Sequence, residues 1–264
     1  MKQFKRYLYL AAVALLAAAC SKDSSSPGSG GYADGGGSGS GIGGSMARFT
    51  VHGDHLYTVE NDKMKVFDIS IPDKPYRLPS KDQTLDAGAE TIFTLDTLLF
   101  IGSQSGMYIY NISRPEFPVR LSLTLHIKSC DPVVASGKYA YVTLNSNSSW
   151  CGRTSNLLQV YDISDPRSPS KVTELPLEGP RGLGIAGDTL FVCDNGIKVY
   201  DVRNPRTPTW IDDLDHIREI AGIRAYDVIP LEKTLLVIGE DGLYQLDHTG
   251  PRLTFISKIA VKRD

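Results

Sequence analysis

The sequence predicts an all-β fold, a five-bladed β-propeller made of four-stranded antiparallel blades. Two observations carry this prediction: one phrase recurs along the chain every 39 to 51 residues, and short apolar runs separated by turn signals fill the intervals. A repeat period of about 40 to 50 residues is typical of propeller blades, each of which supplies four strands. The predicted units are approximately 46–85, 86–127, 128–178, 179–219 and 220–264.

The recurrent phrase starts with an aliphatic residue, an aromatic residue and Asp or Asn, and then runs through two prolines. Its four clear copies are 66–75, 109–118, 160–169 and 199–208, and a shortened fifth copy keeps Leu246, Asp247 and Pro251. Asp or Asn at a strand end accepts a hydrogen bond from the backbone two residues on, and proline stiffens the chain that follows. We therefore interpret the recurrent Asp and Asn as turn residues, because a repeat needs several copies of one turn and not of one catalytic group.

Each unit has the same predicted order of strands. In the fourth unit, Gly187-Asp188 separates two apolar runs, and Asp194-Asn195-Gly196 separates the second run from a third. Both are hairpin signals. The second run is densely apolar, as expected of a strand buried on both faces. A more polar run follows the prolines, for example 171–175, and suits the wet outermost strand of a blade.

The phrases at 66–75 and 160–169 resemble the LVIVD repeat of bacterial and archaeal cell-surface proteins. The resemblance extends over essentially 47–264, although the fifth unit departs from it by losing the Ser and one Pro. It implies a β-propeller at a cell surface, and it implies almost nothing about activity.

The N-terminus predicts export. Lys2, Lys5 and Arg6 precede an apolar run of thirteen residues, 7–19, which has the length of a signal-peptide core. The run ends in small residues before Cys20, which resembles the lipobox of bacterial lipoproteins and implies a signal peptide over 1–19 and a lipid on Cys20. The alternative is an ordinary secretory signal with an incidental cysteine.

Residues 20–45 then form a Gly/Ser-rich tether with a reach on the order of 25–30 Å. Ser21 follows Cys20, and an aspartate there would, by resemblance to enterobacterial lipoproteins, have implied retention at the inner membrane. We expect a protein anchored by its lipid to the bacterial outer membrane, facing the periplasm or the cell surface.

Charge and composition exclude some functions. Beyond the leader, 25 basic residues face 30 acidic ones, so the chain lacks the basic surface that nucleic-acid binding needs. His52 and His55 are weak candidates for a metal site, and no C-x-x-C pair occurs. We therefore expect no nucleic acid, metal or cofactor.

The three remaining cysteines allow one disulfide in an oxidising compartment. Cys130 precedes the first strand of the third unit, and Cys151 lies in an insertion, 145–156, on the same side of that unit. We predict a Cys130–Cys151 bridge, with Cys151–Cys193 as the alternative. Cys193 ends a buried strand and is otherwise expected to be a free core thiol.

In a propeller, the loops that lead into the first strand of each unit lie on the same face as the loops between its second and third strands. In this chain these are the longer loops. Residues that enter the first strands are expected to surround the axial mouth on that loop-rich face. We list the candidate ligand-binding residues as Glu90, Asp131, Trp150, Arg181, Arg224 and Tyr226. Charged groups with an exposed aromatic suit a small polar ligand or a sugar; the alternative is that these groups only pair with one another.

Three functions compete at this point. The first is a non-enzymatic surface module that binds a protein partner or a glycan through the loop-rich face. The second is a glycosidase-like or other hydrolase, with Glu90 and Asp131 as paired carboxylates in the axial pocket. The third is a structural subunit of an envelope complex. The first is favoured, because Arg181 and Arg224 occupy the other mouth positions and no nucleophile or phosphate-binding motif occurs.

Overall fold

The structure is a computed structural model that describes residues 44–125, 132–146, 156–214, 217–220 and 222–261. These residues form antiparallel β-sheets with two short 3-10 turns, so the all-β prediction is confirmed. The elements are β1 (Phe49–His52), β2 (His55–Asp68), β3 (Tyr76–Arg77), η1 (Pro79–Lys81), β4 (Gln83–Leu95), β5 (Leu98–Ser103), β6 (Gly106–Asn111), β7 (Val119–Leu125), β8 (Val133–Ser136), β9 (Tyr139–Leu144), β10 (Leu157–Asp162), β11 (Ser170–Pro176), β12 (Pro180–Ala186), β13 (Thr189–Asp194), β14 (Ile197–Asp201), β15 (Thr209–Asp213), η2 (Arg218–Ile220), β16 (Ala225–Pro230), β17 (Thr234–Gly239), β18 (Gly242–Asp247) and β19 (Thr254–Ala260).

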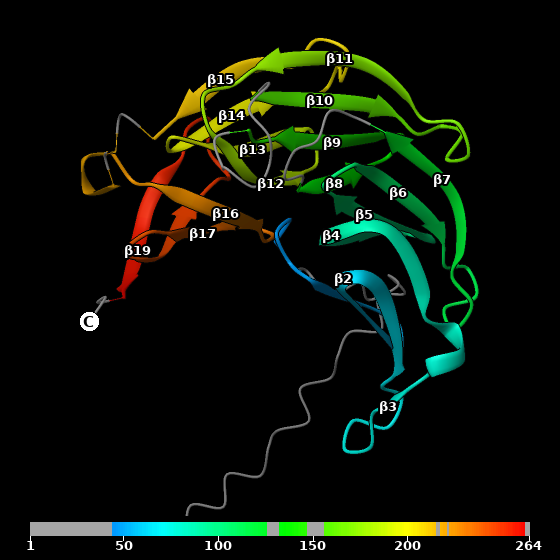
Figure 1. Cartoon of the computed structure of the whole chain (residues 1–264). Coiled ribbons are helices and arrows are strands. Elements are labelled where there is room, and N and C mark those ends of the chain that lie inside the picture. The colour runs from blue at the N-terminus through cyan, green and yellow to red at the C-terminus, as the bar shows by residue number, and fades with distance from the viewer. Residues whose placement is uncertain (1–43, 126–131, 147–155, 215–216, 221, 262–264) are drawn as a thin grey trace, which may run out of the picture. The chain divides into compact units, whose positions relative to one another are not determined.

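The strands pair in chain order. Within the described residues, β8–β11, β12–β15 and β16–β19 each form a four-stranded sheet, while the first seven strands share one sheet because β2 pairs with β4. The first strands of the second to fifth units lie side by side, since β4 contacts β8, β8 contacts β12 and β12 contacts β16. Figure 1 shows the sheets following one another around an arc, with these strands on the inside and β7, β11, β15 and β19 on the outside.

One hydrogen bond identifies the repeat in all five units. In each, the N–H that follows the recurrent Asp or Asn donates to the carbonyl of the turn before the second strand. The pairs are Ile69 to Asp54, Ile112 to Thr97, Ile163 to Lys138, Val202 to Asp188 and His248 to Lys233, at 2.8 to 3.4 Å. Asn61, inside β2, has a φ of 54°, and the Ile69–Asp54 bond brings the two ends of β2 together. The long strand β2 therefore comprises both the second and the third strand of the first unit.

The recurrent Asp and Asn are turn residues, as predicted. In every unit their Oδ1 accepts the backbone N–H two residues on, from Ser70, Ser113, Ser164, Arg203 and Thr249, at 2.7 to 2.9 Å. A tight turn with proline in its second position follows in four units, closed by N–H bonds from Lys74, Phe117, Ser168 and Thr207 to the residue before the first proline.

Turn chemistry also explains the hairpin between the first two strands in the first four units. Gly53, Gly137 and Gly187 have φ values of 54° to 56°, a region that glycine enters without steric cost. The second unit has Asp96 in this place, with a φ of 50°. Asp tolerates that conformation better than most residues with a side chain, so the turn survives the substitution.

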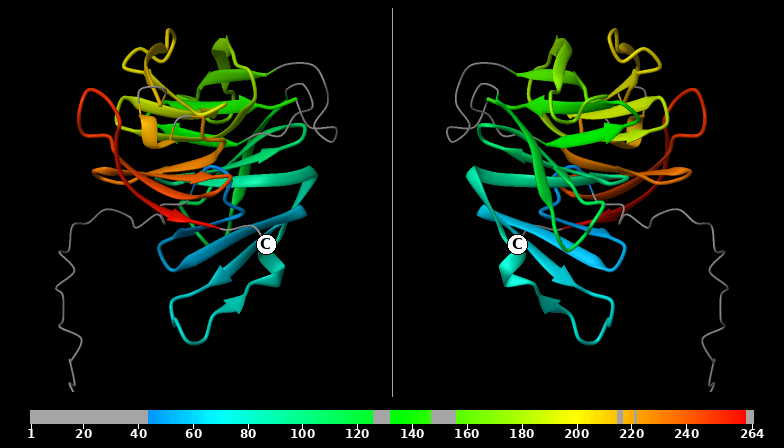
Figure 2. Two further views of the ribbon diagram at one scale, coloured as in Figure 1. Left: turned by 90° about the vertical axis from the view of Figure 1, so that its left-hand side faces the viewer. Right: turned by 90° about the vertical axis from the view of Figure 1, so that its right-hand side faces the viewer.

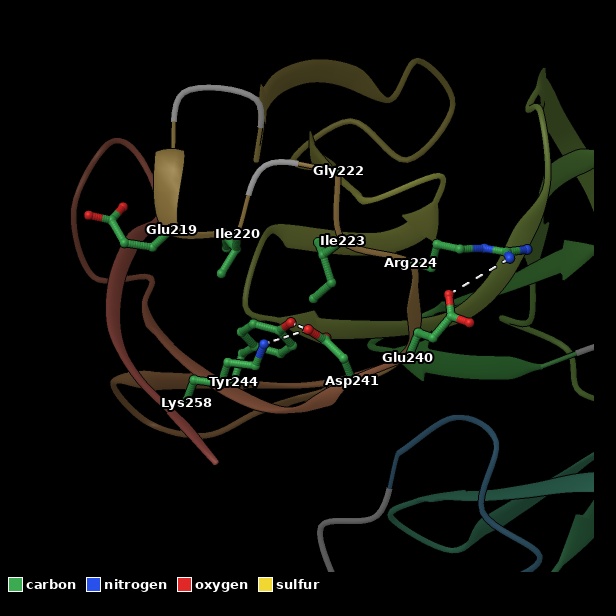
Figure 3. A pocket seen from close by; sticks show the side chains of 9 residues that line it. All are labelled: Glu219, Ile220, Gly222, Ile223, Arg224, Glu240, Asp241, Tyr244 and Lys258. Carbon is green, nitrogen blue, oxygen red and sulfur yellow. Dashed lines mark hydrogen bonds and ion pairs between the residues drawn. The ribbon is translucent and has the colours of Figure 1, made fainter. Parts of the chain in front are cut away.

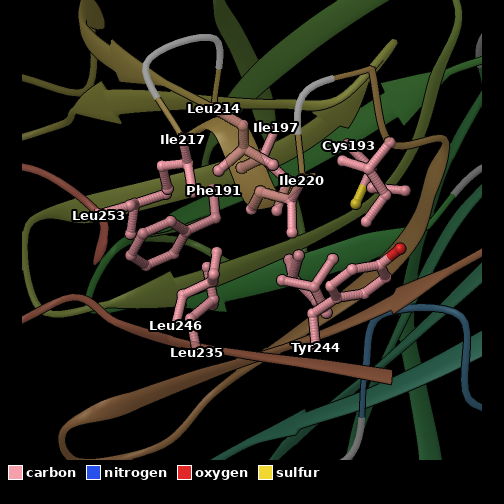
Figure 4. Close-up of a cluster of buried hydrophobic side chains, with 14 of the residues drawn as sticks. Phe191, Cys193, Ile197, Leu214, Ile217, Ile220, Leu235, Tyr244, Leu246 and Leu253 are labelled. Atoms are coloured by element: carbon pink, nitrogen blue, oxygen red, sulfur yellow. The ribbon is translucent and has the colours of Figure 1, made fainter. Parts of the chain in front are cut away.

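The hydrophobic core is divided among the junctions between neighbouring sheets. Phe100 and Val133 join one cluster between the second and third units, and Val134 and Leu183 join another between the third and fourth. Figure 4 shows the cluster between the fourth and fifth units, in which Phe191 and Cys193 pack with Leu235 and other side chains. Cys193 is a free thiol with no exposed surface, as expected, and burial raises its pKa well above the usual value.

The segment 44–48 links sheets that are distant in sequence. Ser45 contacts the fourth and fifth units, since its Oγ donates to Asp227 Oδ1 at 2.9 Å and accepts the Leu183 N–H at 2.7 Å. The Ala47 carbonyl accepts from the Ile92 N–H of the second unit, and the Arg48 carbonyl accepts from the Val59 N–H of the first. We call residues 44–48 the strap; Figure 1 shows it in blue near the inner ends of the strands.

Close backbone approach explains two glycines beside Asp227. A Cβ on Gly44 would lie 2.0 Å from Asp227 Oδ2, and one on Gly182 would lie 2.1 Å from Oδ1. Both distances are far inside van der Waals contact, so neither position accepts a side chain without movement of Asp227. The strap and β12 are thereby held against β16.

The fifth unit, at one end of the series of sheets, is less covered than the fourth. Leu190 to Asp194 of β13 are all buried, whereas β17 alternates between buried and partly exposed residues. Ile238 of β17 pairs with Leu243 of β18, and Leu243 pairs with Ile259 of β19. Ile238 is 40% exposed and Ile259 is 64% exposed. Figure 2 shows the sheets from two further sides, with β3 in cyan at the opposite end of the series.

Candidate binding site

A pocket of about 360 Å³ lies in the fifth unit. Its residues come from the connection into β16, from the turn between β17 and β18, and from β18 and β19. They are Glu219, Ile220, Gly222, Ile223, Arg224, Glu240, Asp241, Tyr244 and Lys258 (Figure 3). The first two of these connections are the kinds that the sequence analysis assigns to the loop-rich face.

Asp241 organises one wall of this pocket. Its Oδ1 accepts a hydrogen bond from the Tyr244 hydroxyl, and its Oδ2 accepts one from Lys258 Nζ. The ammonium of Lys258 also lies 4.8 Å from the centre of the Tyr244 ring, a distance typical of a cation–π contact. Figure 3 shows the three side chains converging from β18, β19 and the turn between β17 and β18.

The charges of this wall are mutually stabilised. Hydrogen bonds lower the pKa of Asp241 below its ordinary value, and the bond from Lys258 has a larger effect than the bond from Tyr244. Hydrogen bonding raises the pKa of Lys258, mainly through Asp241 and to a smaller extent through Tyr244. The pKa of Tyr244 is also raised, and burial is the main cause. At neutral pH the wall therefore presents a carboxylate, an ammonium and a protonated phenol.

A second ion pair and two apolar side chains complete the pocket. Arg224 Nη1 lies 3.8 Å from Glu240 Oε2. Ile220 and Ile223 line the side opposite Tyr244 in Figure 3, and both are buried and belong to the core cluster of the fourth and fifth units. The loop that carries Arg224 is thus anchored in the core, which fixes one wall of the pocket against the other.

Of the residues predicted to surround the mouth, the structure brings two into direct contact. The Arg181 guanidinium lies 4.7 Å from the centre of the Tyr226 ring, so β12 and β16 of neighbouring units meet there. Arg224 lies in the pocket beside Glu240. Glu90 accepts a hydrogen bond from Gln104 Nε2 at 3.2 Å within the second unit.

Five of the predicted site residues lie outside the described residues, namely Cys20, Cys130, Asp131, Trp150 and Cys151. Sequence reasoning missed Asp241, Tyr244 and Lys258. The turn 240–241 could have been found, because it joins the second and third strands of its unit. Lys258 could not, because its approach depends on the pairing of Tyr244 with Lys258 across β18 and β19.

Comparison with known proteins agrees with the repeat. A family model described as the LVIVD repeat matches residues 128–174, which include β8 to β10 and most of β11. The match falls on one repeat, in the third unit. No curated protein matches the sequence. Among the described residues, no helix has the length and apolar character needed to cross a membrane.

Solved structures resemble the chain in fold. A functionally unknown protein from Desulfotomaculum acetoxidans DSM 771 has a TM-score of 0.63 and 11% identity, and the match covers 84% of this chain and 69% of that protein. The periplasmic gluconolactonase PpgL of Pseudomonas aeruginosa has a TM-score of 0.60 and 13% identity, with coverages of 79% and 68%. AztD of Citrobacter koseri has a TM-score of 0.56 and 11% identity, and the match spans 76% of this chain and 58% of AztD. These neighbours are propeller-like, and at such identities the likeness concerns the fold alone.

Proposed function

We propose that this protein is a non-enzymatic binding module, a propeller that a lipid on Cys20 anchors to the bacterial outer membrane and that binds a protein partner or a glycan through its loop-rich face. The observation that carries the proposal is the pocket of the fifth unit, because two of the segments that line it, the connection into β16 and the turn between β17 and β18, are loops of that face. Ligand pockets commonly combine apolar side chains with a few placed polar groups, as Ile220, Ile223 and the ion pairs do here.

The five units are, in this proposal, the five blades of one propeller. The hydrogen bond that recurs in all five units supports the count. The strap supports a link between the first and last blades through the axis, since it bonds to the first, second, fourth and fifth units. A strand shared between the end blades is then not needed to close the ring.

Electrostatics favour binding over hydrolysis. A glycosidase needs one carboxyl group with a raised pKa as the general acid. In the pocket the pKa of Asp241 is lowered by Lys258, and Glu240 faces the guanidinium of Arg224. The carboxylate of Asp241 is therefore held in the charged form. Saccharide hydrolysis by the intact protein, lost in Asp241→Asn and Glu240→Gln, would favour the hydrolase instead.

The test is capture of envelope material by the full-length protein in native membranes, with photo-crosslinking before extraction. A loop-face variant carries Trp150→Ala, Arg181→Ala and Arg224→Ala. A matched variant carries Lys138→Ala and Asp188→Ala, in the short turns that belong to the other face. We expect the intact protein and the matched variant to capture the same protein or glycan, and the loop-face variant to lose it. Equal capture by both variants would place binding elsewhere, and no capture by any form would argue against a binding module.

The anchor has its own test. Labelling of growing cells with a palmitate analogue is expected to mark the intact protein and not Cys20→Ala, and the variant is expected to leave the membrane fraction. An unlabelled intact protein released in soluble form would instead indicate an ordinary secretory signal.

A further inference from the structure

The pocket of the fifth unit has two chemically different walls. Ile220 and Ile223 form an apolar side, while Asp241, Tyr244 and Lys258 form a hydrogen-bonding side. Its volume of about 360 Å³ is at the small end of ligand pockets, which range over about 300–1,000 Å³. A ligand that fits must be small and must carry both an apolar surface and several polar groups.

The hydrogen-bonding side offers donors and acceptors next to one another. A carboxylate has about four acceptor positions, and Asp241 uses one on each oxygen for Tyr244 and Lys258. An ammonium has three donors, and Lys258 directs its bonds to Asp241 and Tyr244. Each group therefore keeps capacity for a further bond. Adjacent hydroxyl groups, each of which donates and accepts, match this arrangement.

The ion pairs disfavour a charged ligand. The lining holds three carboxylates, of Glu219, Glu240 and Asp241, against the two cations of Arg224 and Lys258. Both cations face a carboxylate, Arg224 at Glu240 and Lys258 at Asp241. A ligand with a net charge has to compete with the partner that each cation already has, so it gains less from these partly exposed pairs than it would from an unpaired group. A neutral ligand can bond to both members of a pair and leave the pair intact.

We infer that this pocket binds a neutral saccharide, of the size of a mono- or disaccharide. The inference rests on the proposed binding function and names its ligand class. The hydroxyl groups of the sugar bond to Asp241 and Lys258, and its less polar ring face lies over the small exposed parts of Ile220 and Ile223, which are 4% and 7% exposed. Tyr244 holds Asp241 in place and is a positioning residue.

The test is saturation-transfer NMR on the full-length protein in detergent micelles. The neutral probes are galactose, mannose, N-acetylglucosamine and their β-linked disaccharides, and the charged probes are glucosamine and glucuronate. We expect transfer to at least one neutral sugar, with a dissociation constant in the millimolar range, and at least tenfold weaker binding of the charged probes. Lys258→Met and Asp241→Asn are expected to weaken binding at least tenfold.

The matched control is Lys171→Met, which removes a lysine paired with Glu174 at 2.6 Å on an outer strand away from the pocket. It is expected to bind as the intact protein does. Tyr244→Phe keeps the ring and loses the hydroxyl, so it is expected to weaken binding without unfolding, as a thermal melt would verify. Absence of transfer to every neutral sugar, a preference for charged probes, or unchanged binding in Lys258→Met would each overturn the inference.

The two proposals fail in different ways. If the loop-face variant loses an envelope protein while no sugar binds, the binding module stands and the saccharide pocket falls. If neither envelope material nor sugar binds, both fall.

Discussion

Ser45 and Asp227 are 182 positions apart in the sequence, yet the Ser45 hydroxyl donates to Asp227 Oδ1 at 2.9 Å inside the protein. The Met46 N–H reaches the other carboxylate oxygen at 3.1 Å, and the Val228 N–H adds a third bond. Ser45 is 1% exposed and Asp227 is 6% exposed. The strap is therefore attached to β16 by buried polar contacts, which are strong only while every partner is present.

Replacing Ser45 with alanine is expected to destabilise the protein by about 1–3 kcal/mol, because it leaves Asp227 short of one donor and the Leu183 N–H without its acceptor. Urea unfolding followed by circular dichroism measures the change. The control is Ser70→Ala, which removes an exposed hydroxyl that bonds to Asp68 and is expected to change stability little. Equal effects of the two substitutions would show that the strap contributes no more than an exposed turn.

Stability is expected to depend on pH through Asp227. Burial raises its pKa from 3.8 to about 6, against the opposing effect of its hydrogen bonds. The folded state therefore takes up a proton more readily than the unfolded state, and this contribution is fully present below pH 3.8. It is lost as the pH rises through about 6, and its full size is about 3 kcal/mol at 1.36 kcal/mol per pH unit.

The variant Asp227→Asn separates this contribution from that of other groups. The Cys193 thiol interacts electrostatically with both Asp227 and Arg181. Several turn aspartates, Asp162 among them, have lowered pKa values and act in the opposite direction at low pH. We expect the unfolding free energy of the intact protein minus that of Asp227→Asn to decrease from pH 4 to pH 7. A difference that stays constant over this range would contradict the assignment.

The turn aspartates are expected to act as hydrogen-bond acceptors and not through their charge alone. Asp162→Asn keeps the Oδ1 that accepts the Ser164 N–H, whereas Asp162→Ala removes it. Asn111 already fills this place in the second unit with an equivalent bond. The melting temperature is expected to fall more for Asp162→Ala than for Asp162→Asn. Equal losses would indicate that the ion pair with Arg206 at 3.5 Å matters more than the turn.

The predicted Cys130–Cys151 bridge closes a loop of about 20 residues and would stabilise the fold by about 3 kcal/mol in the chain-entropy model. Mass spectrometry of peptides from the unreduced protein is expected to find these two cysteines linked, with Cys193 alkylated only after unfolding. Cys193 is buried and free in the structure, so a Cys151–Cys193 peptide would contradict both expectations.

The local structure of each unit was predictable from the sequence because its causes are local. The bond from Asp162 to the Ser164 N–H spans two residues, and the left-handed turn at Gly137 depends on one glycine. The second strand of the fourth unit was predicted to be buried on both faces, and β13 is. The corresponding strand of the fifth unit was read in the same way, yet Ile238 is 40% exposed, because burial depends on a neighbouring sheet that the sequence does not place.

The sequence by itself determined the strands, the turns and their repetition, since each rests on hydrogen bonds and side-chain alternation within one period of the repeat. Only the tertiary structure decided which residues distant in sequence meet, such as Ser45 beside Asp227 and Lys258 beside Asp241. Those contacts depend on the register between strands and on the approach of separate units. Many pairings of exposed or partly buried polar residues are compatible with one repeat pattern, and packing of the sheets selects among them.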